Sequence, residues 1–211
     1  MVRPGSVAAD IGTDHAYLPA SLILNGFCPR ALACDLRKGP LSNAAKTVAA
    51  YGLEGKITLR LSDGFDEIEP FEADDLIICG MVMTELVSRA YWLKDPAKRL
   101  ILQPQSHAED IRSYLIHNGF KILYEDACTD SGKLYCAMAV EFTGEEQEFS
   151  AAYPYTGELP KCGKPEAKEY LIKIKEHLAK KYEAQQDFGS AHEAERLKLI
   201  IDETEALIDE M

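Results

Sequence analysis

Short apolar runs alternate with longer segments of helical periodicity over the first 142 residues of the chain. The runs that predict strands lie at residues 7–11, 31–35, 57–61, 76–79, 100–102, 120–124 and 135–142. Segments that predict helices lie between them, at residues 18–25, 40–51 and 108–117. Strands that alternate with helices form a mostly parallel sheet with helices on both faces, so the pattern predicts an α/β fold of the Rossmann-like type. Only a turn at residues 129–133 separates the final two strands, which predicts an antiparallel edge.

The pattern changes near residue 165, where apolar side chains recur every three or four residues. Two such runs flank a break at Gly189, and Ser190 is a candidate cap for the second; the apolar positions are Leu171, Ile174, Leu178, Tyr182, Leu197, Ile200, Ile201, Thr204, Leu207 and Ile208. This spacing predicts two antiparallel helices packed as a coiled-coil hairpin. We therefore predict a sheet domain over residues 1–148, a linker over residues 149–164 and a helical hairpin over residues 165–211. Prolines and glycines between residues 153 and 164 leave the linker little potential for helix or strand.

The composition, with 46% apolar side chains among 211 residues, is that of a globular protein. No apolar run reaches about 18 residues, and the first residues lack a signal-peptide core, so we expect a cytoplasmic protein without a membrane partner. Six cysteines form no CxxC pair and stand mostly in apolar runs. They predict reduced, buried thiols and no metal site. The oligomeric state is open, and we expect a monomer.

The net charge of −12 disfavours a general nucleic-acid binder. One segment departs from this balance, because residues 161–181 contain seven lysines and three glutamates. Such a run is typical of a solvated helix face. It also attracts a polyanion locally, which makes Lys173, Lys175, Lys180 and Lys181 candidate RNA-binding residues.

The first predicted strand ends in a turn that is rich in carboxylates. Asp10 closes the strand, Gly12 permits a tight turn, and Asp14, His15 and Tyr17 follow. A strand that turns over a glycine is how a Rossmann-like sheet meets a nucleoside cofactor. The dinucleotide form needs two more glycines, whose places are held here by Asp14 and Tyr17, so a pyrophosphate is disfavoured. A cationic cofactor without phosphate, such as S-adenosylmethionine (SAM), fits the carboxylates; the alternative is an ordinary junction with surface carboxylates.

Three further predicted strands end in groups suited to a nucleoside. Asp35 ends the second strand, where a carboxylate can accept hydrogen bonds from both ribose hydroxyls. Asp63-Gly64 follows the third strand, where a carboxylate can accept from an adenine amino group, and Gly80-Met81 follows the fourth. Each group alone is commonly a solvated strand end. Because ligands of such sheets bind at the carboxyl ends of the strands, the set of four indicates a SAM site.

In these motifs the chain resembles class I SAM-dependent methyltransferases, and more specifically the bacterial family of tRNA (adenine-22-N1)-methyltransferases. That family joins such a domain to a C-terminal coiled-coil hairpin. The matching stretches are residues 9–19, 39–41, 63–64, 80–81, 100–104 and 132–135. The resemblance implies a SAM site lined by Asp10, Gly12, Asp35, Asp63, Gly64, Gly80 and Met81.

The resemblance also implies methyl transfer from SAM to N1 of an adenine in tRNA. Asp14, His15 and Tyr17 would lie where the cofactor meets the base, with Gln103 and Pro104 bordering the base pocket. Adenine N1 has an in-plane lone pair and attacks without first losing a proton, so the ring becomes cationic. Asp14 is the candidate to stabilise that charge or to accept a proton from the amino group. His15 is the candidate to orient a carboxylate or the base.

A target base in folded RNA must leave its stack, and flipped bases are held between aromatic or apolar groups. Tyr17 and Met81 are candidates for this contact. Tyr17 fits a second interpretation equally well, as an aromatic residue of the core.

Other functions stay open at this point. The family carries Gly-Met-Gly-Gly after the fourth strand, whereas Val82-Met83 follows Met81 here, and this difference favours a non-catalytic protein that binds SAM and RNA. A methyltransferase for another substrate would leave the hairpin without a role. A nicotinamide-dependent oxidoreductase is disfavoured by the two missing glycines.

The basic segment yields a first testable prediction. Replacing Lys173, Lys175, Lys180 and Lys181 with Glu is expected to weaken tRNA binding without changing SAM binding, because phosphate contacts are lost while the cofactor site is untouched. Filter binding of tRNA and calorimetry with SAM measure the two affinities. Unchanged tRNA affinity would refute that role and assign the helices to packing or to dimer formation.

Overall fold

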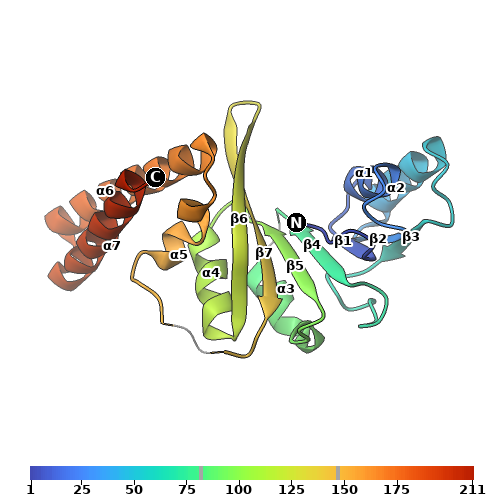
Figure 1. Ribbon diagram of the computed structural model, residues 1–211, viewed down its shortest axis with the longest axis horizontal. Coiled ribbons are helices and arrows are strands. Elements are labelled where there is room, and N and C mark those ends of the chain that lie inside the picture. The colour runs from blue at the N-terminus through green and yellow to red at the C-terminus, as the bar shows by residue number, and fades with distance from the viewer. Residues whose placement is uncertain (81–82, 146–147) are drawn as a thin grey trace.

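The computed structural model describes residues 1–80, 83–145 and 148–211 (Figure 1). In this part of the chain seven strands form one sheet in the order β3-β2-β1-β4-β5-β7-β6. The strands β1 to β5 pair in parallel, and β7 lies antiparallel to both β5 and β6. The strands are β1 Ala8–Ile11, β2 Ala31–Asp35, β3 Ile57–Leu61, β4 Asp75–Cys79, β5 Arg99–Gln103, β6 Phe120–Asp130 and β7 Lys133–Phe142. The predicted Rossmann-like fold with an antiparallel edge is confirmed.

Helices α1 to α4 cover the two faces of the sheet. The helices are α1 Tyr17–Leu24, α2 Lys38–Ala50, α3 Met83–Arg89, α4 Ala108–His117, α5 Tyr153–Thr156, α6 Pro165–Phe188 and α7 Ala191–Asp209, with short 3₁₀ turns η1 Tyr91–Leu93 and η2 Leu159–Lys161. Successive residues of a strand point to opposite faces. Ile77 of β4 therefore packs with α1 and α2, whereas Leu76 and Ile78 pack with α3 and α4. The core is thus two apolar layers, one on each side of the sheet.

The segment predicted to be a linker without secondary structure contains α5 and η2 instead. Pro154 and Pro160 each stand in the first turn of one of these short helices, where proline needs no N–H partner and its fixed φ suits the helix. Thr156 and Leu159 are buried. The expectation of little helix potential was therefore wrong, while the domain boundaries themselves stay a prediction.

Other details also differ from the sequence pattern. The expectation of buried thiols holds for Cys28, Cys34 and Cys136, but Cys79 and Cys128 are exposed near strand ends. The helices α3 and η1 were not predicted. The residue Ser190 occupies the N-cap position of α7, but its side chain makes no capping hydrogen bond.

The C-terminal helices α6 and α7 lie side by side at one end of the molecule (Figure 1). Their seam holds Leu178, Leu197 and Ile200, all buried. A second cluster joins Leu171 and Ile208 of the helices to Ala127, Cys136 and Leu159. The helical hairpin is therefore packed on the β6–β7 edge of the sheet.

A fully buried ion pair ties these parts together. The Arg112 Nε of α4 donates to Glu125 Oε1 of β6 over 2.9 Å, and neither side chain is more than 3% exposed. The same guanidinium donates to the carbonyls of Pro154 and Tyr155 and lies 3.4 Å from Cys136 Sγ. The second carboxylate oxygen of Glu125 accepts a hydrogen bond from the backbone N–H of Glu158, the residue before η2, at 2.7 Å. Four segments of the chain thus share one buried charge pair.

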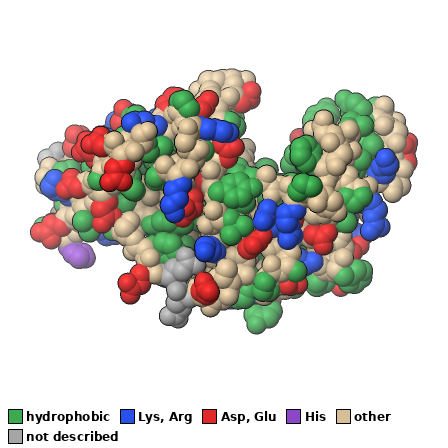
Figure 2. Space-filling view, viewed as in Figure 1, with side chains coloured by type: hydrophobic (Ala, Val, Ile, Leu, Met, Phe, Trp, Pro, Cys, Tyr) green, Lys and Arg blue, Asp and Glu red, His purple; other side chains and the backbone are tan. Residues whose placement is uncertain are grey.

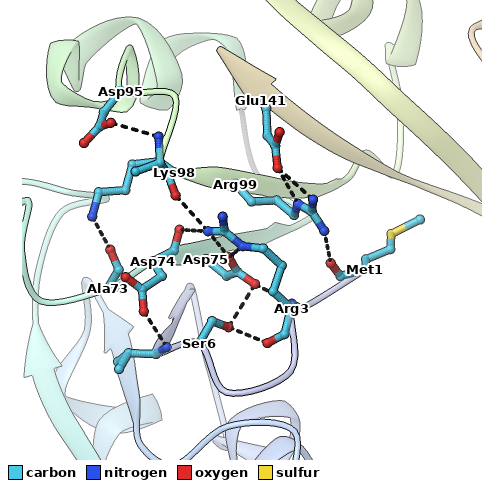
Figure 3. A network of polar contacts seen from close by, with 12 residues as sticks. Met1, Arg3, Ser6, Ala73, Asp74, Asp75, Asp95, Lys98, Arg99 and Glu141 are labelled. Atoms are coloured by element: carbon cyan, nitrogen blue, oxygen red, sulfur yellow. Dashed lines mark hydrogen bonds and ion pairs between the residues drawn. The ribbon is translucent and has the colours of Figure 1, made fainter. Parts of the chain in front are cut away.

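A polar network lies at the amino-terminal ends of β4 and β5 (Figure 3). Asp75 is fully buried and accepts hydrogen bonds from the backbone N–H of Arg3 and from Ser6 Oγ. The Arg3 guanidinium pairs with the same carboxylate, and Lys98 Nζ donates to a backbone carbonyl at 2.7 Å. Arg99 of β5 pairs with Glu141 on β7. These contacts fix the amino ends of β4 and β5, opposite the edge where the candidate site lies.

Within residues 1–80, 83–145 and 148–211, no helix combines the length and the apolar composition that a membrane span requires. The His, Cys, Asp and Glu side chains of the same residues form no group of three or more that is placed to hold a metal ion.

The buried pair predicts a large and asymmetric effect of substitution. Arg112→Ala leaves Glu125 charged and unpaired, and is expected to lower the free energy of unfolding by about 3–5 kcal/mol. Arg196→Ala, which removes an exposed i,i+3 pair with Glu193, is the matched control and should cost about 1 kcal/mol or less. The double change Arg112→Met with Glu125→Leu should recover much of the loss. Urea unfolding measures all three, and equal losses for the two arginine variants would contradict the prediction.

Candidate active site

The carboxyl ends of β1, β2 and β4 meet at one edge, because these strands are adjacent and parallel. Asp10 pairs in register with Ala33 of β2 and with Ile77 of β4. The turn after β1 is anchored on β2, since the N–H groups of Gly12 and Thr13 both donate to the carbonyl of Cys34 at 2.9 Å. The predicted SAM-site groups Asp10, Gly12, Asp35 and Gly80 therefore share one edge, where Figure 2 shows the surface hollowed between the β6–β7 hairpin and the α1–α2 region.

The turn after β1 is strained as well as anchored. Asp14 and Ala16 have φ values of 51° and 55°, in the left-handed region that residues other than glycine rarely occupy. Hydrogen bonds hold this geometry, from Ala16 N to Thr13 O at 3.0 Å and from Asp14 N to Asp35 Oδ2 at 3.3 Å. Strain of this kind is often kept where it positions functional groups.

The strained turn presents two stacked rings. The His15 and Tyr17 rings lie 5.3 Å apart with an angle of 8° between their planes. Tyr17 is 63% exposed, which leaves it outside the core and overturns the interpretation as a core aromatic. His15 Nε2 lies 3.4 Å from Asp14 Oδ2, and both side chains face solvent. The arrangement offers a carboxylate, an imidazole and an aromatic ring beside the predicted cofactor edge.

Two buried carboxylates lie beneath this turn. Asp10 is 6% and Asp35 is 7% exposed. Burial raises the pKa of Asp10 to about 6; the hydrogen bond from Thr13 Oγ1, at 2.7 Å, lowers it, and the nearby Asp35 charge raises it further. Asp35 accepts the N–H of Arg37 at 2.9 Å. Concentrated negative charge at this edge favours a cation and repels phosphate.

The turn after β3 brings Asp63 and Gly64 against α3. Gly64 has a φ of 59°, and a side-chain carbon there would lie 2.4 Å from Leu86 Cδ2. The Asp63 carboxylate is half-exposed and lies 3.6 Å from Nη1 of Arg89. Arg89 therefore competes with a ligand's amino group for the Asp63 carboxylate. The sequence pattern did not predict this pairing of Arg89 with Asp63.

A pocket of about 390 Å³ opens beside Gly80, at the ends of β4 and β5. Its other lining residues are Met83, Thr84, Pro104, Gln105, Ser106, His107, Asp110 and Ile111. Of the two predicted pocket residues, Pro104 lines the pocket, while Gln103 is not among its lining residues and donates from Nε2 to the Pro104 carbonyl at 3.1 Å. Met81 and Val82 lie outside the described residues.

Sequence reasoning missed Gln105 and His107. Gln105 packs so closely on Gly80 that a side-chain carbon at Gly80 would lie 2.9 Å from Gln105 Nε2. His107 has a φ of 54° at the N-cap position of α4, which directs the chain around the pocket. The adjacent Gln-Pro motif was the available signal for Gln105, whereas the conformation of His107 has no sequence signature.

The four predicted lysines of α6 have different surroundings. Lys175 Nζ lies 2.9 Å from Glu205 Oε1 and bridges α6 to α7. Lys173 lines a second pocket that faces the β6–β7 hairpin. Lys180 and Lys181 are exposed further along α6.

The sheet order and the carboxylates at the ends of β1 and β2 define the class: a Rossmann-like class I methyltransferase. The chain belongs to the methyltransferase-domain family, whose model matches residues 1–138.

Several relatives are also similar to the chain. A tRNA (adenine(22)-N(1))-methyltransferase of Bacillus subtilis is 35% identical over 140 residues, which are 65% of this chain and 59% of that protein. The match thus spans less than two thirds of that relative's length. The crystal structure of the B. subtilis m1A22 tRNA methyltransferase has a TM-score of 0.80 and 28% identity, over 99% of this chain and 93% of that one. A Streptococcus pneumoniae protein, named as a candidate tRNA (m1A22) methyltransferase and solved with SAM, has a TM-score of 0.81 and 30% identity, over 95% and 94%.

The raised pKa of Asp10 predicts a pH-dependent stability. The folded protein binds the Asp10 proton more tightly than the unfolded chain does. Protonated Asp10 therefore stabilises the fold fully below pH 4, and this stabilisation is lost as the pH rises through 6. A shift from 3.8 to about 6 corresponds to about 3 kcal/mol. The Asn side chain of Asp10→Asn does not ionise, so this variant keeps its stability as the pH rises. Its free energy of unfolding relative to wild type should therefore increase by about 3 kcal/mol between pH 4 and pH 7.

Urea unfolding at several pH values measures the difference between the two proteins. Asp14→Asn removes an exposed carboxylate from the same turn and serves as the control. A difference between wild type and Asp10→Asn that stays constant over this range would show that Asp10 titrates normally.

Proposed function

We propose that this protein transfers the methyl group of SAM to N1 of an adenine in tRNA, at the position that corresponds to nucleotide 22. The observation that carries the proposal is the acidic turn after β1, placed at the same sheet edge as the open pocket at Gly80. The names of the B. subtilis and S. pneumoniae relatives support the substrate and the position.

The residues at the sheet edge fit SAM by their chemistry. Asp35 ends β2, where its carboxylate can accept from the ribose hydroxyls, and Asp63 can accept from the adenine amino group. Asp10 and Gly12 at the end of β1 and Gly80 at the end of β4 lie at the same edge of the sheet. Two buried carboxylates offset the positive charge of a sulfonium group, and they oppose the binding of a dinucleotide phosphate. When bound, SAM supplies a methyl group on a sulfonium that leaves as a neutral thioether.

The chain's own residues then act on the target base. Tyr17 offers an exposed ring on which a flipped adenine stacks. N1 needs no general base, because its lone pair is free. Asp14, on the same turn as Tyr17, stabilises the positive charge that grows on the adenine as the bond forms. His15 lies 3.4 Å from Asp14 and holds the carboxylate toward the base.

One feature favours a second candidate, a protein that binds SAM and RNA without turnover. Met83 lines the pocket at the position where the resembled family carries glycine, so a side chain occupies space beside the base. Product formation separates the two functions, because only the enzyme transfers the methyl group.

The test is transfer of labelled methyl from SAM to a tRNA transcript with adenine at position 22, beside a matched transcript with guanine there. Label in the adenine transcript alone is expected. Asp14→Asn should lower kcat by about 100-fold with SAM binding unchanged, because charge stabilisation is lost only in the transition state. Asp202→Asn, an exposed carboxylate on α7, is the control and should leave kcat unchanged.

Absence of label with intact SAM binding would favour the non-catalytic protein. Equal label in both transcripts would preserve methyl transfer but refute the position.

A further inference from the structure

The β6–β7 hairpin extends beyond the rest of the sheet. Strand β7 pairs with β5 over residues 138–141, but its pairing with β6 continues to Lys133. Because β7 runs antiparallel to β5, the extension lies past the carboxyl end of β5, at the edge that carries the candidate site. Figure 1 shows the hairpin tip projecting from the sheet.

The tip is braced and has a defined conformation. Its two turn residues, Ser131 and Gly132, have φ values of 49° and 76°, as in the tight two-residue turns that match the twist of a hairpin. Ala127 and Cys136 on its flanks pack with Leu171 of α6. The hairpin tip and α6 are therefore held in a fixed relation to each other.

A groove of about 540 Å³ runs between the hairpin tip and α6. One wall is residues 132–135 of the tip, the other is formed by α6, and Pro104 and Gln105 form its end; the lining residues of α6 are Tyr170, Lys173 and Ile174. Pro104 and Gln105 also line the pocket beside Gly80. The groove and the candidate base pocket therefore adjoin each other across these two residues.

The groove has the chemistry of a nucleic-acid strand site. Lys133 on the tip and Lys173 on α6 place one exposed cation on each wall of the groove, in a protein of net charge −12. Lys173 makes an i,i+4 pair with Glu169 in which both side chains are more than half exposed, so the pair is weak and can exchange for a phosphate. Tyr135 and Tyr170 add half-buried aromatic surface between the cations. Cations combined with aromatic side chains are how proteins bind unpaired nucleotides.

We propose that this groove binds the RNA strand next to the target nucleotide, with Lys133 and Lys173 contacting its phosphates from opposite walls. The inference rests on the proposed function, since it takes the pocket beside Gly80 as the site of the flipped base. It assigns a role to the hairpin tip, and it separates Lys173 from the other lysines of α6.

The test compares Lys133→Ala and Lys173→Ala with Lys198→Ala. Lys198, on α7, is a matched control, because it is an exposed lysine with an i,i+4 acidic partner at a similar distance. Each groove variant is expected to weaken tRNA binding by about 3-fold to 10-fold and to reduce the slope of log affinity against log salt by about one. The KM for tRNA should rise in step, while kcat at saturating tRNA, SAM affinity and the control variant stay as in wild type.

The outcomes separate this inference from the proposed function. If wild type transfers methyl to tRNA but the groove variants bind tRNA as tightly as Lys198→Ala does, the groove is refuted and the function stands. If wild type transfers no methyl while the groove variants still lose tRNA affinity selectively, the function fails and the groove stands. Equal losses of tRNA affinity in all three variants would indicate that any exposed lysine attracts the RNA, and would refute the groove as its binding site.

Discussion

The buried pair between Arg112 and Glu125 is the interaction on which the arrangement of this protein depends. Two charges removed from water are costly unless each donor and acceptor finds a partner. Here the partners come from α4, β6, β7 and the segment between Pro154 and η2, so all four must occupy one geometry. Even Gly157 is constrained, because a side-chain carbon there would lie 1.9 Å from Glu125 Oε2. Since α4 begins at the pocket and β6–β7 carries the groove, the same pair sets the positions of both.

The candidate site depends on a different constraint, the cost of burying a carboxylate, to which a second carboxylate nearby adds. Asp10 and Asp35 are buried at adjacent strand ends, and Asp14 stands above them in a strained conformation. Burial raises the pKa of Asp10 to about 6. A cationic ligand would lower the cost of ionising Asp10. In the proposed function, this gain would contribute to the free energy of SAM binding. Ionised Asp10 therefore costs stability at the edge where the cofactor is proposed to bind.

The sequence was sufficient to predict the parallel strands and their carboxyl ends, because apolar runs such as those containing Ile77 and Ile101 are continuous and short. It could not predict α5, since Pro154 lies in the first turn of a helix whose stability comes from tertiary contacts. The sequence also could not predict which lysines form ion pairs. The partner of Lys175, for example, is Glu205, which lies on another helix. Lys133 lies in a stretch that matches the resembled family, but the sequence assigned it no role, because a lysine on a turn is ordinary until α6 places Lys173 across from it.

The distribution of charge bears on how an acidic protein could act on a polyanion. Carboxylates gather at the ends of β1 and β2, so a phosphate backbone is repelled from that edge. Lys133 and Lys173 attract the backbone to the groove, which adjoins the pocket through Pro104 and Gln105. In the proposed reaction a neutral base can approach Asp14, whereas the phosphates flanking it cannot. The carboxylates at the sheet edge and the lysines of the groove would together select an extruded nucleotide over a stacked one. Only extrusion places the base at the carboxylates while its phosphates stay in the groove.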